Sequence, residues 1–129
     1  MTAFQPDDRP SVVPRLFTED VAGLVTFLKA AFHAQGELVF DRPTELVIGD
    51  SVLMVANGGG VRHPTSSAFY IYVKDVQSAW ARAVEAGAES YCEPEDTPWG
   101  DRRAIVNDQW GNHWQIAKHD GASGGLSAP

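Results

Sequence analysis

A chain of 129 residues is about the size of one ordinary domain and is long enough to bury an apolar core. Hydrophobic residues make up 43% of the chain and charged residues 21%, a balance that excludes intrinsic disorder. The formal net charge of −7 argues against nucleic acid or an anionic membrane as a partner, because both attract clustered Lys and Arg.

The two ends of the chain and its single cysteine indicate a cytoplasmic protein. Residues 1–10 are expected to be a flexible lead-in without the basic start and apolar centre of a signal peptide, and residues 120–129 a flexible tail. No apolar run approaches the roughly 20 residues of a membrane helix. Cys92 cannot form an intrachain disulfide, and the nearby carboxylates of Glu93 and Glu95 are expected to keep it a poor thiolate. We interpret Cys92 as structural.

Residues 11–57 predict one strand, one helix and three further strands. The β-like run over 11–17 contains Pro14, which indicates a sheet edge or the start of a strand. An N-cap is available within 18–20, and apolar residues then recur every three or four positions, which predicts a helix ending near Gln35–Gly36. The three further strands are expected at Glu37–Asp41, Glu45–Ile48 and Ser51–Ala56, with a tight turn at Gly49–Asp50.

A glycine-rich linker at 58–66 is followed by the same order of elements over 67–119. The second helix begins after Asp75, ends at Gly87 and carries Trp80 on its apolar stripe, which we expect to lie in the core. The strands are expected at Ala68–Val73, Glu89–Cys92, Arg103–Val106 and His113–Ala117. The sequence therefore predicts an α+β fold in which two tandem βαβββ modules form a curved mixed sheet around a cleft, as one domain over 11–119.

Short motifs in both modules occur in the order of one known superfamily. The first module has Val-Pro-Arg-Leu at 13–16 and Asp-Val-Ala-Gly at 20–23, and the second has Pro-Trp-Gly-Asp-Arg at 98–102 and Asn-Asp-Gln-Trp-Gly-Asn at 107–112. This order resembles the glyoxalase/bleomycin-resistance/dioxygenase (vicinal oxygen chelate) superfamily, particularly its bleomycin-resistance-like or PhnB-like members. Gln109 stands where the family usually has proline, a change that a type I turn accepts.

The resemblance implies positions for a divalent metal that this sequence does not fill. Metal-dependent members place His, Gln or Glu on four strands, at positions that match Val13, Leu53 or Met54, Tyr70 and Gln115. Only Gln115 has a side chain able to ligate, and one neutral amide holds a divalent cation poorly. We therefore expect no metal and no other cofactor.

A small metal site on the last strand is the alternative. His113, Gln115 and His119 share one face of that strand if it extends far enough, because side chains alternate along a strand. His113 is also the best acid–base candidate, since histidine titrates near neutral pH without a large shift. The sequence names no base together with a stabiliser of negative charge, so the catalytic residues stay unassigned.

The groove implied by the resemblance is lined by aromatic and polar residues. Rings and a guanidinium suit a flat ligand, and Trp99 matches a tryptophan that stacks on the drug in bleomycin-resistance proteins. Packing between modules explains Trp99 equally well. Arg102 and Arg103 flank Asp101 and are expected to be solvated rather than to bind an anionic group. The expected ligand-binding residues are Arg15, Tyr70, Tyr72, Trp99, His113 and Gln115.

Three functions are compatible with these residues. The leading hypothesis is a metal-free protein that binds a small molecule, such as an antibiotic or another aromatic or cationic ligand, in a groove of a homodimer. Trp110, in a turn before a strand, is the candidate dimer contact. The alternative is a lyase, isomerase or dioxygenase that uses one divalent metal ion through His113 and Gln115. The third is an interaction module without a ligand, since function resides in the site rather than in the fold.

Overall fold

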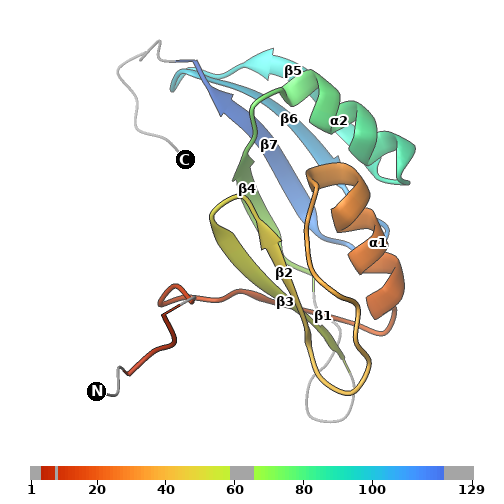
Figure 1. Cartoon of the computed structure of the whole chain (residues 1–129). Coiled ribbons are helices and arrows are strands. Elements are labelled where there is room, and N and C mark those ends of the chain that lie inside the picture. Colours follow the sequence, from red (N-terminus) through yellow and green to blue (C-terminus); the bar gives the residue numbers. More distant parts are fainter. Residues whose placement is uncertain (1–3, 8, 59–65, 121–129) are drawn as a thin grey trace. The chain divides into compact units, whose positions relative to one another are not determined.

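The computed structural model describes residues 4–7, 9–58 and 66–120, which belong to two compact units, Met1–Thr65 and Ser66–Pro129 (Figure 1). The α+β class and the two βαβββ-like modules predicted from the sequence are confirmed. The predicted linker and tail lie almost entirely outside the described residues. Within the described ranges, no helix is long and apolar enough to cross a membrane.

The first unit packs one helix against a three-stranded sheet. Its elements are β1 (Arg15–Thr18), α1 (Val21–Phe32), β2 (Thr44–Ile48) and β3 (Ser51–Asn57). The strand order is β1-β3-β2, with β1 parallel and β2 antiparallel to β3. As expected, Pro14 directly precedes a strand at the edge of the sheet, where its missing N–H costs no ladder hydrogen bond.

Helix α1 begins as predicted but ends earlier than predicted. The Asp20 side chain caps it by accepting the N–H of Gly23 at 3.1 Å. The helix ends at Phe32, and not near Gln35–Gly36, because His33 takes the left-handed conformation with φ of 58°. The N–H groups of His33 and Ala34 then bond back to the last turn, at 3.1 and 3.3 Å. A glycine usually marks such an end, so a histidine in its place gave no signal.

The predicted strand Glu37–Asp41 does not form. Gln35 pairs with Val47 in an isolated bridge, and the chain then leaves the sheet. The Thr44 hydroxyl closes the resulting loop, since it accepts the N–H of Val39 and donates to the Val39 carbonyl, both at 3.1 Å. This local side-chain bonding replaces the strand ladder that the composition favoured.

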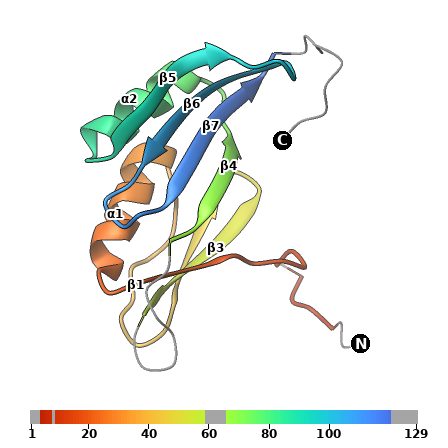
Figure 2. The ribbon, with the colours of Figure 1, turned by 180° about the vertical axis from the view of Figure 1, so that it is seen from behind.

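The described part of the second unit has one helix and a four-stranded sheet, with the helix on one face of the sheet (Figures 1 and 2). The strand order is β4-β7-β6-β5, with β4 parallel to β7 and the other pairs antiparallel. The helix-covered face buries Trp114 and Ile116, and the Trp114 ring stacks on Phe69 at 4.5 Å between centroids. The elements are β4 (Ala68–Tyr72), α2 (Val76–Glu85), β5 (Glu89–Asp96), β6 (Asp101–Asn107) and β7 (His113–His119).

Two details of this unit differ from the prediction. Strands β5, β6 and β7 extend beyond the predicted Glu89–Cys92, Arg103–Val106 and His113–Ala117. Trp80 is not part of the buried core but is only half-buried, with its indole N–H donating to the Ser90 hydroxyl at 2.9 Å. Helix α2 buries the smaller Val76, Ala79 and Ala83 instead.

Buried polar side chains fix the turn between β6 and β7. Asp108 accepts the backbone N–H groups of Trp110 and Asn112, both at 2.9 Å, and the indole N–H of Trp114, also at 2.9 Å. The Asn112 side chain donates to Asp108 and accepts the N–H of Ser67. These bonds, rather than a prolyl ring, hold the turn, which explains why it accepts Gln109.

Candidate functional site

The sheet face opposite α2 gathers aromatic and polar side chains from three strands of the second unit. Every second residue of a strand shares a face, and the register sets Tyr70 beside Gln115 and Asp101 beside His119. We call this surface the tyrosine face. It consists of Tyr70, Tyr72, Asp101, Arg103, His113, Gln115 and His119.

Asp101 is the centre of a hydrogen-bond network on the tyrosine face. Its carboxylate is 1% exposed. Its Oδ2 accepts the hydroxyl of Tyr70 at 2.6 Å and that of Tyr72 at 3.1 Å, while its Oδ1 lies 2.9 Å from Nδ1 of His119. Its backbone is held by the Thr97 hydroxyl, which accepts the Asp101 N–H at 3.0 Å and donates to the Asp101 carbonyl at 2.9 Å. Both oxygens of this buried carboxylate therefore have hydrogen-bond partners.

The network sets the protonation states of its members. Burial raises the pKa of Asp101, but the hydrogen bonds from Tyr70, His119 and Tyr72 together bring that pKa below its ordinary value. Burial and the hydrogen bond to Asp101 raise the pKa of Tyr70 to about 12, and the same causes raise the pKa of Tyr72. At neutral pH, Asp101 is therefore an anion and both tyrosines are hydrogen-bond donors.

Trp99, in the turn before β6, is held at its edge and on one face. Its indole N–H donates to the Tyr70 hydroxyl at 3.1 Å, and the guanidinium carbon of Arg103 lies 5.2 Å from its ring centroid. Arg103 in turn donates from Nη1 to Oε1 of Gln115 at 2.9 Å. One continuous set of contacts therefore runs from Gln115 through Arg103, Trp99 and Tyr70 to Asp101.

The structure brings together four of the six expected ligand-binding residues. Tyr70, Trp99 and Gln115 belong to the continuous set, and Tyr72 joins it through Asp101. The two others stand outside this set. His113 lies on the tyrosine face, but its Nδ1 bonds with Asn107 at 3.1 Å. Arg15 is an exposed residue of β1 in the first unit.

Asp101 and Arg103 are the site residues that the sequence did not indicate, and His119 was considered only for the alternative metal site. The expectation that both arginines are solvated is right for Arg102, which is exposed and pairs with Asp96 at 3.2 Å, and wrong for Arg103, which is half-buried against Trp99. The predicted strand began two residues late, at Arg103. If the alternation of side chains along this strand is extended back to Asp101, Asp101 and Arg103 are predicted to share one face.

The residues at the inherited metal positions do not fit a divalent cation. Val13, Met54 and Tyr70 supply no strong ligand, and Oε1 of Gln115 already accepts a hydrogen bond from a guanidinium, which repels a cation. His113 and His119 do not join Gln115, since they bond to Asn107 and Asp101. Nowhere in the described ranges do three or more His, Cys, Asp or Glu residues gather as a metal-binding group.

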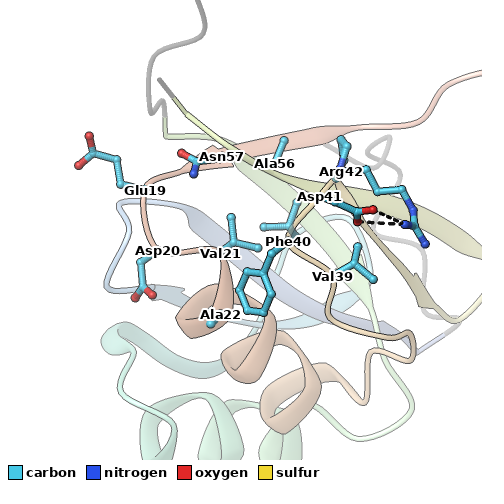
Figure 3. Close-up of a pocket in the computed structure, with 12 residues that line it drawn as sticks. Glu19, Asp20, Val21, Ala22, Val39, Phe40, Asp41, Arg42, Ala56 and Asn57 are labelled. Carbon is cyan, nitrogen blue, oxygen red and sulfur yellow. Dashed lines mark hydrogen bonds and ion pairs between the residues drawn. The ribbon is translucent and has the colours of Figure 1, made fainter. Parts of the chain in front are cut away.

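A separate pocket of about 450 Å³ lies in the first unit, where the 39–43 loop passes the start of α1 (Figure 3). Its charged side chains are largely committed to neighbours: Arg42 pairs with Asp41 at 3.0 Å, and Asp20 caps α1. The pocket thus offers a mixed polar and apolar wall. Its lining comprises Glu19, Asp20, Val21, Ala22, Val39, Phe40, Asp41, Arg42, Pro43, Val55, Ala56 and Asn57.

Comparison with known proteins agrees with the fold and the motif order. The family model described as the glyoxalase/bleomycin resistance protein/dioxygenase superfamily matches residues 11–116. An uncharacterized protein of Mycobacterium bovis is 29% identical over 127 residues, covering 84% of this chain and 83% of that protein. The crystal structure of TioX from Micromonospora sp. ML1 has a TM-score of 0.71 at 26% identity and covers 85% of this chain and 98% of its own. A glyoxalase-related enzyme from Fulvimarina pelagi has the same fold, with a TM-score of 0.72 at 21% identity over 84% of this chain and 87% of its own. The chain belongs to the glyoxalase/bleomycin resistance protein/dioxygenase superfamily.

Proposed function

We propose that this protein binds a small planar organic molecule on the tyrosine face without a metal ion, in the manner of the bleomycin-resistance-like members of its superfamily. The observation that carries the proposal is the fixed but partly exposed ring of Trp99. Tyr70 holds its indole N–H and Arg103 covers one face, so the ring is oriented before a ligand arrives. A pre-oriented aromatic contributes stacking without a further loss of side-chain entropy.

The alternative of a metal-dependent lyase, isomerase or dioxygenase receives less support from the donor set. Gln115 is engaged by a cationic side chain, and His113 is engaged by Asn107. Tyr70, with its raised pKa, is a poor general base at neutral pH. The polar groups on this face thus orient and donate rather than exchange protons.

The test is a titration of the full chain with a library of planar fragments in the presence of EDTA. Binding is followed by the indole N–H signals in a proton–nitrogen NMR spectrum, assigned with Trp99→Phe and Trp110→Phe. We expect fragments to shift the Trp99 signal and to lose about two- to tenfold in affinity in Trp99→Phe, since stacking on an aromatic contributes about 0.5–1.5 kcal/mol. Trp110→Phe should bind unchanged. Binding that requires an added divalent metal ion, or that leaves the Trp99 signal unmoved, would contradict the proposal.

The proposal includes a cytoplasmic homodimer with Trp110 at the contact between copies. Trp110 is half-exposed at the turn between β6 and β7, and the lone thiol of Cys92 suits a reducing compartment. Sedimentation equilibrium should give twice the chain mass for the wild type and a weaker dimer for Trp110→Ser. A monomer at all concentrations would remove this part of the proposal.

A further inference from the structure

Arg103 is a half-buried cation without a carboxylate partner. Among the described residues no Asp or Glu oxygen lies within ion-pair distance of its guanidinium, whereas Arg9, Arg42 and Arg102 each have such a partner. Charged side chains that are withdrawn from water are normally paired. The charge of Arg103 is therefore available to something other than the protein.

Arg103 also lacks part of the hydrogen bonds that its guanidinium could make. Nη1 donates to Gln115, but Nε is buried and has no acceptor in the described part of the chain. A buried donor without an acceptor costs about 1–3 kcal/mol. The Nε and Nη2 edge of a guanidinium recognises a carboxylate with two parallel hydrogen bonds. Among the described residues, the one side-chain hydrogen bond of Arg103 comes from Nη1, and this edge makes none.

Two carboxylates lie near Arg103 in the strand register without forming an ion pair with it. Asp101, two residues before Arg103 on β6, uses both oxygens for Tyr70, Tyr72 and His119. Glu95 lies opposite Arg103 in the β5–β6 register and accepts a hydrogen bond from the Cys92 thiol at 3.2 Å.

We propose that Arg103 binds an anionic group, most simply a carboxylate, on the planar ligand of the tyrosine face, through its Nε and Nη2 edge. This inference rests on the proposed function and names its ligand class as aromatic acids rather than the cationic ligands that the leading sequence-based hypothesis included. The aromatic body of the ligand contacts Trp99. Because Nε is buried, the guanidinium has to turn toward the ligand, and the anion then supplies the acceptor that Nε lacks. Arg103 then binds the charge of the ligand next to Gln115, the residue that matches a metal-ligand position of the metal-dependent members.

The experiment compares three probes of similar shape and different charge: naphthoate, neutral naphthamide and cationic naphthylmethylamine. Each is titrated into the full chain while the Trp99 indole signal and the Arg103 Nε–H signal are followed by NMR. We expect the wild type to prefer naphthoate over naphthamide by about 10- to 100-fold, the range of a charge-assisted, two-bond contact. Arg103→Gln should abolish that preference, so that naphthoate and naphthamide bind to this variant with equal affinity.

Arg102→Gln is the matched control, because it removes the same charge from the adjacent residue on the opposite face of β6 and should keep the naphthoate preference. Arg103→Lys keeps the charge but not the planar fork, so an intermediate preference is expected, and it provides the comparison if Arg103→Gln does not fold. Equal binding of naphthoate and naphthamide to the wild type, or an unchanged preference in both Arg103 variants, overturns the inference while the proposed function stands. If none of the three probes moves the Trp99 signal, the proposed function itself fails for aromatic ligands and this inference fails with it.

Discussion

The Asp101→Asn variant tests whether the hydrogen-bond network organises the second unit. Asparagine keeps one acceptor oxygen for the two tyrosines but turns an N–H₂ group toward His119. Each tyrosine bond then weakens by about 1 kcal/mol, the difference between a charged and a neutral acceptor. The His119 bond is lost at a further cost of about 1 kcal/mol, a reduced value because the histidine side chain is 59% exposed. We therefore expect Asp101→Asn to lower the free energy of unfolding by about 3 kcal/mol.

The assay is urea unfolding followed by circular dichroism at pH 7, with Asp96→Asn as the control. Asp96 is also a carboxylate beside β6, but it is exposed and pairs with exposed Arg102, so its variant should stay within about 0.5 kcal/mol of the wild type. Because the pKa of Asp101 is lowered in the folded state, its contribution is present above the ordinary range of aspartate and is lost as the pH falls below about 4. The gap between wild type and Asp101→Asn should thus be present at pH 7 and narrow in acid. A gap below about 0.5 kcal/mol at pH 7 would refute the reasoning.

Three further predictions follow from local features of the chain. Because the pKa of Tyr70 is raised to about 12, its contribution to stability is present below about pH 10 and falls as the pH rises toward 12. In an absorbance titration at 295 nm, Tyr70→Phe should lack one of the late ionisation steps of the wild type. Gly49→Ala should cost about 1 kcal/mol in urea unfolding, since Gly49 has φ of 58° while no atom lies within 4 Å of the added methyl group; an unchanged stability would show that the turn relaxes. The hydrogen bond to Glu95, with burial, raises the pKa of the Cys92 thiol. Iodoacetamide at pH 8 should therefore alkylate Cys92 slowly, and Glu95→Gln should accelerate the reaction. Equal rates in the two proteins would contradict this cause.

The sequence predicts the elements well where local signals agree. Asp75 caps α2 as expected, accepting the Ser78 N–H at 3.1 Å, and the alternating strands of the second module lie at their predicted positions. The end of β5 was missed because Glu93–Asp96 has little intrinsic strand preference. There the register sets Asp96 opposite Arg102, and a cross-strand pair of opposite charges extends the ladder beyond what composition indicates.

The site was only partly predictable, for a different reason. Alternation along one strand shows that Tyr70 and Tyr72 share a face, but only the pairing of β4 with β7, and of β7 with β6, brings Asp101 to both hydroxyls. The same pairing sets Arg103 within reach of Gln115. Whether an arginine is solvated or partly buried depends on which strand lies beside it, and neighbouring residues in the sequence do not carry that information.

The direction of the hydrogen bonds explains why the net charge does not predict the ligand. The Tyr70 hydroxyl donates a hydrogen bond to Asp101 and accepts one from the indole N–H of Trp99, and Oε1 of Gln115 accepts a hydrogen bond from Arg103. The strongest acceptors of the tyrosine face are therefore used within the protein, while the Nε and Nη2 donors of Arg103 are not. A surface with spare donors favours a ligand rich in acceptors, because each new bond satisfies a group that is otherwise unmet. The formal charge of −7 describes the whole chain, whereas recognition depends on the few groups at the site whose hydrogen bonds are unmet, and among the described residues Nε of Arg103 is such a group.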